Sequence, residues 1–307
     1  MSGVWALQGL TYLGILVFVV VVARKAFRYA SAPMHLRWEI YPVPHEVGKG
    51  YGGSYMEEVD WWKKPRETTL IGELAAMIPE MVFLVALLHH NRKMWAFSFP
   101  FHGGIYLSIG FVLLLLLGGI VQALGTAVAA GPDALLFILY WLTIIIGVLG
   151  MIAVALGALG LLARRVFNGD LRRYSTPADY FNLVFILLIA IVGLISWLTV
   201  DLSFGQLRAF AQGLVTLNPP AAVDGLVYAE VVLLSLFLLY MPFTHMTHFV
   251  GKYFTYHAVR WDDTPNFGGV SYERQLQRLL TRKVSWSAPH VGKGRSWVEV
   301  ATKGVQE

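Results

Sequence analysis

Five long apolar stretches constrain this chain more than any other feature of its sequence. A transmembrane helix needs about 20 mostly apolar residues, and each stretch is close to or above that length. The stretches are Val4–Val22, Phe101–Leu124, Leu135–Leu162, Tyr180–Val200 and Leu226–Val250. With 56% hydrophobic and 14% charged residues, the chain is predicted to be an all-α integral membrane protein with five transmembrane helices.

The positions of Lys and Arg predict how the chain crosses the membrane. Ten lie in residues 24–93, four in 164–173 and nine in 252–303, whereas Arg208 alone lies on the opposite side. This positive-inside pattern predicts a multi-pass protein of the cell inner membrane, with the N-terminus outside and the C-terminus in the cytoplasm. The net charge of +5 therefore reports topology and does not indicate nucleic acid binding.

The sequence outside the spans divides into a long loop and a tail. Leu70–Leu88 is a sixth apolar stretch, but it carries Glu73 and Glu80 and has basic residues at both ends. We therefore expect it to form a helix that lies along the membrane interface. The expected organisation is a first transmembrane helix in residues 1–22, a cytoplasmic loop with the interfacial helix in 23–100, helices two to five in 101–250, and a cytoplasmic tail in 251–307.

The chain contains no cysteine and nine histidines. Without cysteine it cannot form disulfides, bind an iron–sulfur cluster through thiolates or build a thiolate zinc site. Any redox centre must therefore depend on histidine. The histidines within or at the edge of an apolar stretch are His102, His245 and His248.

His102 and His248 are predicted to lie at similar depth. His102 is at the cytoplasmic start of the second span and His248 at the cytoplasmic end of the fifth. At 1.5 Å per residue both would lie one to two turns inside the membrane. A lone histidine in a span is often an interhelical hydrogen-bonding group. Two imidazoles at equal depth on different helices instead suit the axial positions of a haem iron.

The surroundings of His102 agree with a bound macrocycle. Gly103 and Gly104 would let a flat ring approach the backbone, and Arg92 and Lys252 lie where propionates could emerge. Glycine and basic residues at a helix end also arise from packing and topology alone.

Several motifs resemble the gamma subunit of respiratory nitrate reductase, a five-span b-type cytochrome that oxidises quinol. They are Phe101-His102-Gly103-Gly104, the run from Arg164 to Asp179, and Leu239-Tyr240-Met241-Pro242-Phe243-Thr244-His245-Met246-Thr247-His248. Residues 33–46 and 252–263 are similar to a branch of these proteins, the membrane cytochrome b subunits of sulfate-reducer redox complexes. Two such complexes are linked to type II cytochrome c3 and to dissimilatory sulfite reduction.

The resemblance implies a b-type cytochrome subunit of an anaerobic respiratory complex. It implies that haem b, held by the 101–250 bundle, passes electrons between menaquinone or menaquinol and an iron–sulfur subunit on the cytoplasmic side. It leaves open a multihaem cytochrome c on the outer side. The direction of electron flow stays open as well.

One departure from the family pattern affects the expected number of haems. Nitrate reductase gamma carries four haem-ligating histidines, and His102 and His248 match the cytoplasmic-side pair. The outer pair would fall at Val112 and Glu230, neither of which provides a neutral imidazole, so one haem b is expected. A second haem would have to be cytoplasmic, with ligands drawn from His89, His90, His245 and His257.

Glu230 is an acidic residue within the fifth span. A charged side chain there costs about 2.5–3.5 kcal/mol on insertion scales, so the carboxyl must be paired, protonated or functional. Either it is a neutral acid bonded to Tyr228 or Ser196, or it transfers protons to or from a quinone bound near the haem.

Two other functions are compatible with the apolar helices. In a proton or solute transporter, Glu230, His245 and His248 would line a path, although the odd number of spans and the lack of an internal repeat speak against it. In a haem-free anchor subunit, the histidines would be structural. A reduced-minus-oxidised spectrum separates these alternatives.

Overall fold

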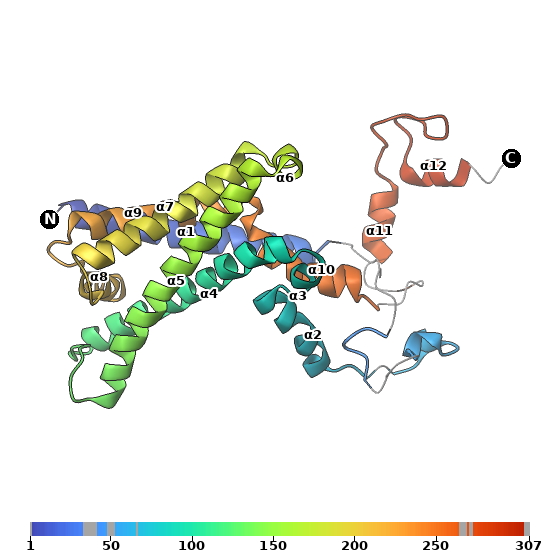
Figure 1. Ribbon diagram of the computed structural model, residues 1–307. Helices are drawn as coiled ribbons and strands as arrows, with labels where there is room; N and C mark the ends of the chain where they lie inside the picture. Colours follow the sequence, from blue (N-terminus) through green and yellow to red (C-terminus); the bar gives the residue numbers. More distant parts are fainter. Residues whose placement is uncertain are drawn as a thin grey trace. The chain divides into compact units, whose positions relative to one another are not determined.

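The structure is a computed structural model that describes residues 2–32, 42–47, 53–65, 67–263, 269 and 273–303. Within these ranges it is helical, and the β pairing consists of isolated bridges. The helices are α1 (Ser2–Ala30), η1 (Tyr55–Glu57), η2 (Trp61–Lys63), α2 (Leu70–Phe83), α3 (Val85–His90), α4 (Arg92–Ala123), α5 (Ala134–Phe167), α6 (Gly169–Arg173), α7 (Pro177–Thr199), α8 (Gly205–Thr216), α9 (Gly225–Tyr240), η3 (Met241–Phe243), η4 (His245–Thr247), α10 (His248–Thr255), the π-helix η5 (Tyr256–Arg260), α11 (Glu273–Leu280) and α12 (Trp297–Lys303) (Figure 1).

The prediction of a five-helix membrane protein is confirmed. Among the described residues, five helical segments are long and apolar enough to span a membrane. They are Gly3–Ala30, Arg92–Ala123, Ala134–Phe167, Pro177–Thr199 and Gly225–Phe243. The chain divides into two compact units. The first comprises Met1–Val22 and Ile71–Thr247, and the second comprises Ala23–Leu70 and His248–Glu307.

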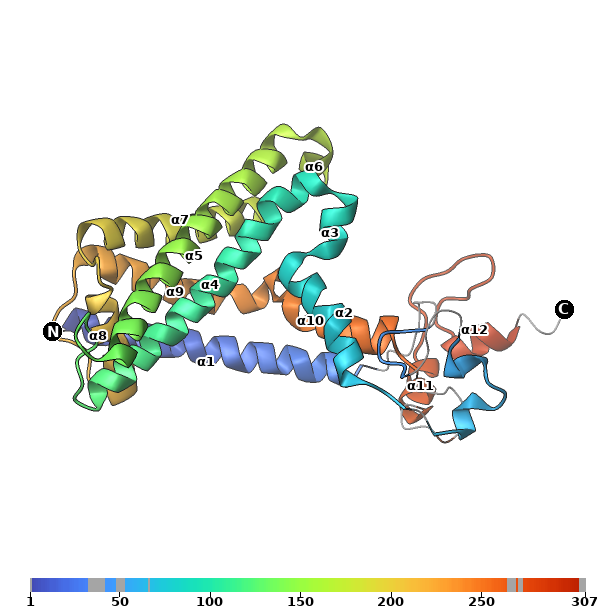
Figure 2. The ribbon, with the colours of Figure 1, turned by 60° about the horizontal axis from the view of Figure 1, so that its bottom comes forward.

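Helices α4 and α5 form a close antiparallel pair in the first unit (Figure 2). A Cβ at Gly104 would lie 2.5 Å from the backbone nitrogen of Val154, and one at Gly157 would lie 2.5 Å from that of Phe101. Small residues at such contacts let two backbones approach closely, which is how helices gain packing energy in a lipid environment.

Buried polar contacts fix α1 against the rest of the first unit. Gln8 Nε2 donates to the carbonyl oxygen of Gly213 at 2.9 Å, and Tyr12 donates to that of Leu214 at 2.7 Å. These carbonyls belong to the last turn of α8, where helical carbonyls lack partners within the helix. Farther along α1, the hydroxyls of Thr11 and Ser235 are 2.9 Å apart, which joins α1 to α9.

Helix α8 closes one end of the bundle. Its Leu207, Phe210 and Ala211 are buried in the main hydrophobic core. A Cβ at Gly119 of α4 would lie 2.6 Å from the nitrogen of Gln212. The helix therefore packs on α4 within the protein.

The sixth apolar stretch breaks into two short helices, of 14 residues in α2 and six in α3. Leu84 between them has a φ of 53°, which ends α2. Neither piece is long enough to cross a bilayer. Side chains of α4 hold the turn: Trp95 donates to the carbonyl oxygen of Phe83 at 2.7 Å, and Tyr106 donates to that of Met81 at 2.8 Å.

The boundary of α7 agrees with the local sequence pattern, whereas that of α9 differs from the expected one. Helix α7 begins after Thr176, whose N–H donates to the carboxylate of Asp179 at 2.8 Å, as the Thr-Pro-Ala-Asp pattern predicts. Helix α9, in contrast, ends at Tyr240, ten residues before the expected Val250. Pro242 lacks an N–H and so cannot donate to the carbonyl oxygen four residues before it. Met241 keeps helical backbone angles, and the chain continues in two short 3₁₀ turns.

The second unit brings together two distant segments of the chain. His45 Nε2 lies 3.1 Å from a carboxylate oxygen of Asp263, and the Tyr55 hydroxyl donates to the same oxygen. Trp261 packs edge-on against His45 and is almost fully buried. Residues 33–41 lie outside the described residues.

Candidate functional site

His102 lies on α4 and is held by the preceding turn of its own helix. Its Nδ1 is 2.8 Å from the backbone carbonyl oxygen of Ser98, with the Ser98 hydroxyl 3.3 Å away. A carbonyl oxygen only accepts, so Nδ1 carries the proton in the neutral ring. The lone pair then lies on Nε2, and this tautomer is the one that an axial metal ligand requires.

The two glycines after His102 have different surroundings. A Cβ at Gly104 would collide with Val154 of α5, whereas one at Gly103 would meet no atom within 4 Å. The small size of Gly104 thus serves the α4–α5 contact. Gly103 presents bare backbone to open space, which fits the close approach of a flat ring.

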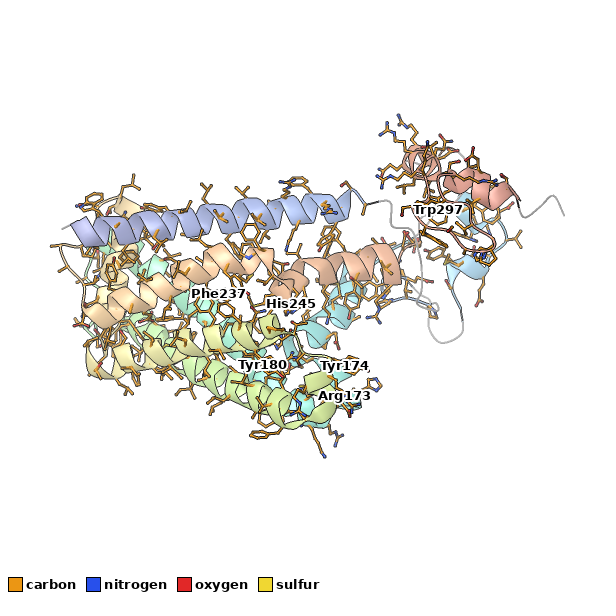
Figure 3. All side chains as sticks on the ribbon, turned by 90° about the horizontal axis from the view of Figure 1, so that it is seen from above. Arg173, Tyr174, Tyr180, Phe237, His245 and Trp297 are labelled. Carbon is orange, nitrogen blue, oxygen red and sulfur yellow. The ribbon has the colours of Figure 1, made fainter. Side chains whose placement is uncertain are left out.

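His245 lies at the same end of the first unit as the start of α7 (Figure 3). Its Nε2 is 3.4 Å from a carboxylate oxygen of Asp179. This contact fixes His245 against the first turn of α7. His245 side-chain exposure is 62%, so its imidazole stays reachable from outside the protein.

His248 is placed differently from the prediction. It begins α10 in the second unit and is exposed, whereas we expected it on a helix continuous with the fifth span. Because α9 ends at Tyr240, the rise of one straight helix does not give its depth. His102 belongs to the first unit and His248 to the second, so their pairing stays a prediction.

The remaining predicted residues lie at helix ends. His90 ends α3 and Arg92 begins α4, and both are exposed. Lys252 of α10 lies 6.0 Å from the centre of the Tyr256 ring in a cation–π arrangement. His257, in the π-helix η5, has its Nδ1 2.9 Å from the carbonyl oxygen of Tyr253.

Glu230 is buried in α9, with 8% of its surface exposed. Its Oε2 has no hydrogen-bond partner, and a Cβ at Gly193 of α7 would lie 3.1 Å from its Oε1. The Ser196 hydroxyl lies near this carboxyl, and the negative charge of Asp201 disfavours a second negative charge on it. Tyr228 is directed elsewhere, since its hydroxyl donates to the carbonyl oxygen of Gly3.

An acidic and a basic residue are buried together near the α8 end. Asp201 accepts from the backbone N–H groups of Gln206 and Leu207 at 3.0 and 3.2 Å, so it caps α8. Burial raises the pKa of Asp201 above its ordinary value, although these donors and the charge of Arg208 oppose the shift. Arg208 is 2% exposed and contacts Gly118, where a Cβ would lie 2.9 Å from its Cδ.

Residues 88–262, more than half of the chain, match the family described as the nitrate reductase gamma subunit. The chain belongs to this family. The Hdr-like menaquinol oxidoreductase cytochrome b-like subunit of Archaeoglobus profundus is 27% identical over 114 residues. That match spans 36% of this chain and 33% of the relative. The resemblance inferred from the motifs is confirmed for the family, and the protein is a multi-pass membrane protein.

Three residues of this nitrate reductase gamma family protein were missed as functional candidates. Ser98 was four residues before His102, a spacing that places a helical carbonyl within reach of an imidazole. Asp201 lies between the fourth span and α8, and an acid just before a helix is a common N-cap. Gly193 gave no local signal, because its role depends on Glu230 of another helix.

Proposed function

We propose that this protein is the membrane cytochrome b subunit of a menaquinol-linked oxidoreductase, with His102 and His248 as axial ligands of one haem b. The observation that supports it best is the His102 ring, whose Nδ1 is bonded to the Ser98 carbonyl. Family membership and the printed name of the Archaeoglobus profundus relative agree with this function.

The residues present fit a haem that has two protein ligands. Within the described ranges, no group of three or more His, Asp or Glu side chains could hold a metal ion, and the chain lacks cysteine. Two imidazoles suffice when a porphyrin supplies the other four ligands. Haem b, when bound, provides a one-electron carrier within the membrane. Ser98 would orient the His102 ring, and Gly103 would admit the ring system.

The direction of insertion and the partners form part of the proposal. The basic residues of 24–93, 164–173 and 252–303 favour the cytoplasmic side of an inner membrane for these segments. An iron–sulfur subunit would dock there, because this chain has no thiolate to hold a cluster itself. A cytochrome c partner on the other side stays open, as does a second haem with ligands such as His245 and His90.

Spectra of single variants test the haem assignment. In the full-length protein, His102→Ala and His248→Ala should each abolish the reduced-minus-oxidised b-type spectrum while the protein still inserts. His290→Ala, which removes an exposed histidine, is the matched control and should retain the spectrum. A bis-histidine haem that persists in both variants would refute the assignment. A wild-type protein without a haem spectrum would favour the anchor or transporter.

Removal of the tail tests the partner. A chain that lacks residues 270–307 should insert and keep its haem but lose the iron–sulfur subunit during co-purification. If the complex survives this deletion unchanged, the tail does not form the docking surface.

A further inference from the structure

Glu230 and Ser196 form a buried polar pair between α9 and α7. The exposed fractions of these residues are 8% and 1%. Neither Glu230 Oε2 nor Ser196 Oγ makes a hydrogen bond of ordinary geometry, although the Ser196 hydroxyl lies close enough to the Glu230 carboxyl to interact with it. Buried polar atoms in native proteins almost always have partners. Two neighbouring polar atoms without such bonds leave hydrogen-bonding capacity unused, which a proton on the carboxyl or a water molecule would satisfy.

The packing of α5 against α4 gives the depth of this pair relative to His102. Glu230 contacts α7 at Gly193. A Cβ added at Gly193 would lie 2.6 Å from the Met151 sulfur as well. Met151 follows Gly150 on α5. A Cβ added at Gly150 would contact Leu107 and Ser108 of α4. These α4 residues are five and six positions beyond His102, which corresponds to about 8–9 Å along the helix.

A second acid links the pair to the α8 end of the bundle. The Ser196 carbonyl oxygen accepts the N–H of Asp201 at 3.0 Å, so Asp201 lies little more than one turn beyond Ser196. The charge of Asp201 acts on Glu230. Ser196 thus lies between the deeper acid and an acid near the aqueous end of the span.

Other titratable groups surround this end of the bundle. Arg208 on α8 faces Asp201 and lies 5.9 Å from the ring centre of Tyr140 on α5. Tyr228 on α9 and Tyr12 on α1 donate to backbone carbonyls. Asp201 is the charged side chain of the described residues whose effect reaches Glu230.

We propose that Glu230 and Ser196 form a buried proton-binding site that is loaded from the α8 end past Asp201 and responds to charge at His102. This proposal rests on the proposed function, since the charge at His102 would be that of a haem that gains and loses an electron. Each electron gained adds one negative charge, and one proton taken from water at the α8 end converts the Glu230 carboxylate to its neutral acid. When the electron leaves, the acid returns its proton, so charges and protons balance.

Three variants of the full-length protein test the proposal. Glu230→Gln keeps the size and hydrogen-bonding capacity but cannot titrate, and Ser196→Ala removes the intermediate hydroxyl. Ser235→Ala is the matched control, because Ser235 is a buried hydroxyl on α9 that bonds to Thr11. A retained haem spectrum shows that each variant folds. The midpoint potential of the haem is then measured across neutral pH, together with the infrared C=O band of protonated carboxyls.

We expect the wild-type potential to fall as pH rises, because proton binding favours the reduced state. Glu230→Gln should lose this dependence and also one infrared carboxyl band. Ser196→Ala should slow the rate at which that band follows a pH jump, whereas Ser235→Ala should match the wild type. An unchanged pH dependence and an intact band in Glu230→Gln would overturn the proposal and leave the haem assignment standing. A wild-type protein without haem would refute the coupling, and the infrared titration alone would then show whether Glu230 exchanges protons.

Discussion

The imidazole of His45 lies 3.1 Å from the carboxylate of Asp263, across 218 positions of sequence. Both residues belong to segments that suggested the resemblance to sulfate-reducer cytochrome b subunits. Tyr55 donates to the same carboxylate, and Trp261 packs against the imidazole. The second unit is therefore organised around a buried hydrogen-bond network, which joins the loop after α1 to the segment after α10.

Loss of this network should loosen the second unit. His45→Ala leaves the Asp263 carboxylate with one fewer partner in a mostly buried site, which should destabilise the unit by about 1–3 kcal/mol. Limited proteolysis of the purified protein should then cut residues 23–70 faster than in the wild type. His290→Ala serves as the control, because His290 is exposed. Equal cleavage rates in His45→Ala and the control would contradict the structural role.

An added side chain should destabilise the protein at Gly104 but not at Gly103. Gly104→Val places atoms where Val154 already lies, so α4 and α5 must separate at a cost of about 1–3 kcal/mol. Gly103→Ala meets no protein atom within 4 Å, and alanine has the higher helix propensity, so it should not lower the thermal unfolding temperature of the haem-free protein in detergent. If Gly104→Val unfolds at the same temperature as Gly103→Ala, the close helix contact is wrong.

Asp201 should make the first unit less stable as pH rises. Its pKa is raised in the folded protein, so the folded state binds its proton more tightly than the unfolded state. Its contribution to stability is therefore fully present below the unfolded value of about 3.9, and it is lost as pH rises through the folded pKa. Asp201→Asn keeps an α8 cap but removes titration.

Thermal unfolding of wild type and Asp201→Asn over mildly acidic pH measures this contribution. The difference between the two unfolding temperatures should change in favour of the variant as pH rises. A difference that is constant with pH would exclude Asp201 as the titrating group.

Tyr240 anchors α9 to α7 through a side-chain contact. Its hydroxyl donates to Asn182 Oδ1 at 2.8 Å, whereas the Asn182 amide nitrogen has no hydrogen-bond partner. Tyr240→Phe should lower the free energy of unfolding by about 0.6 kcal/mol, with an upper value near 1.7 kcal/mol for hydrogen bonds between membrane helices. Tyr174→Phe changes an exposed ring and should have no effect. Denaturant titration in mixed micelles measures both free energies of unfolding. Equal values for the two variants would show that the Tyr240 hydroxyl does not hold α9 to α7.

The features that depended on local sequence were predictable. The apolar length of each span and the cap at Thr176 follow from residues that are close together in the chain. The break at Leu84 was not predicted, because we expected one helix over Leu70–Leu88 and leucine rarely adopts a positive φ. A span must contain about 20 apolar residues whatever its neighbours are, so composition alone locates it. Pro242 is a local signal for the end of α9. The prediction of a span that reaches Val250 followed the length of the apolar run instead.

The tertiary structure decided which face of each helix meets another helix. Lipid tails are as apolar as a packed leucine, so the sequence of a span shows little contrast between its lipid-facing and protein-facing sides. For this reason the sequence did not distinguish Gly104, which contacts α5, from Gly103, which meets open space. Nor did it show that α8 packs on α4, or that Gly193 of α7 makes room for Glu230. Those relationships require the helices to be placed side by side, because each joins residues that only tertiary packing brings together.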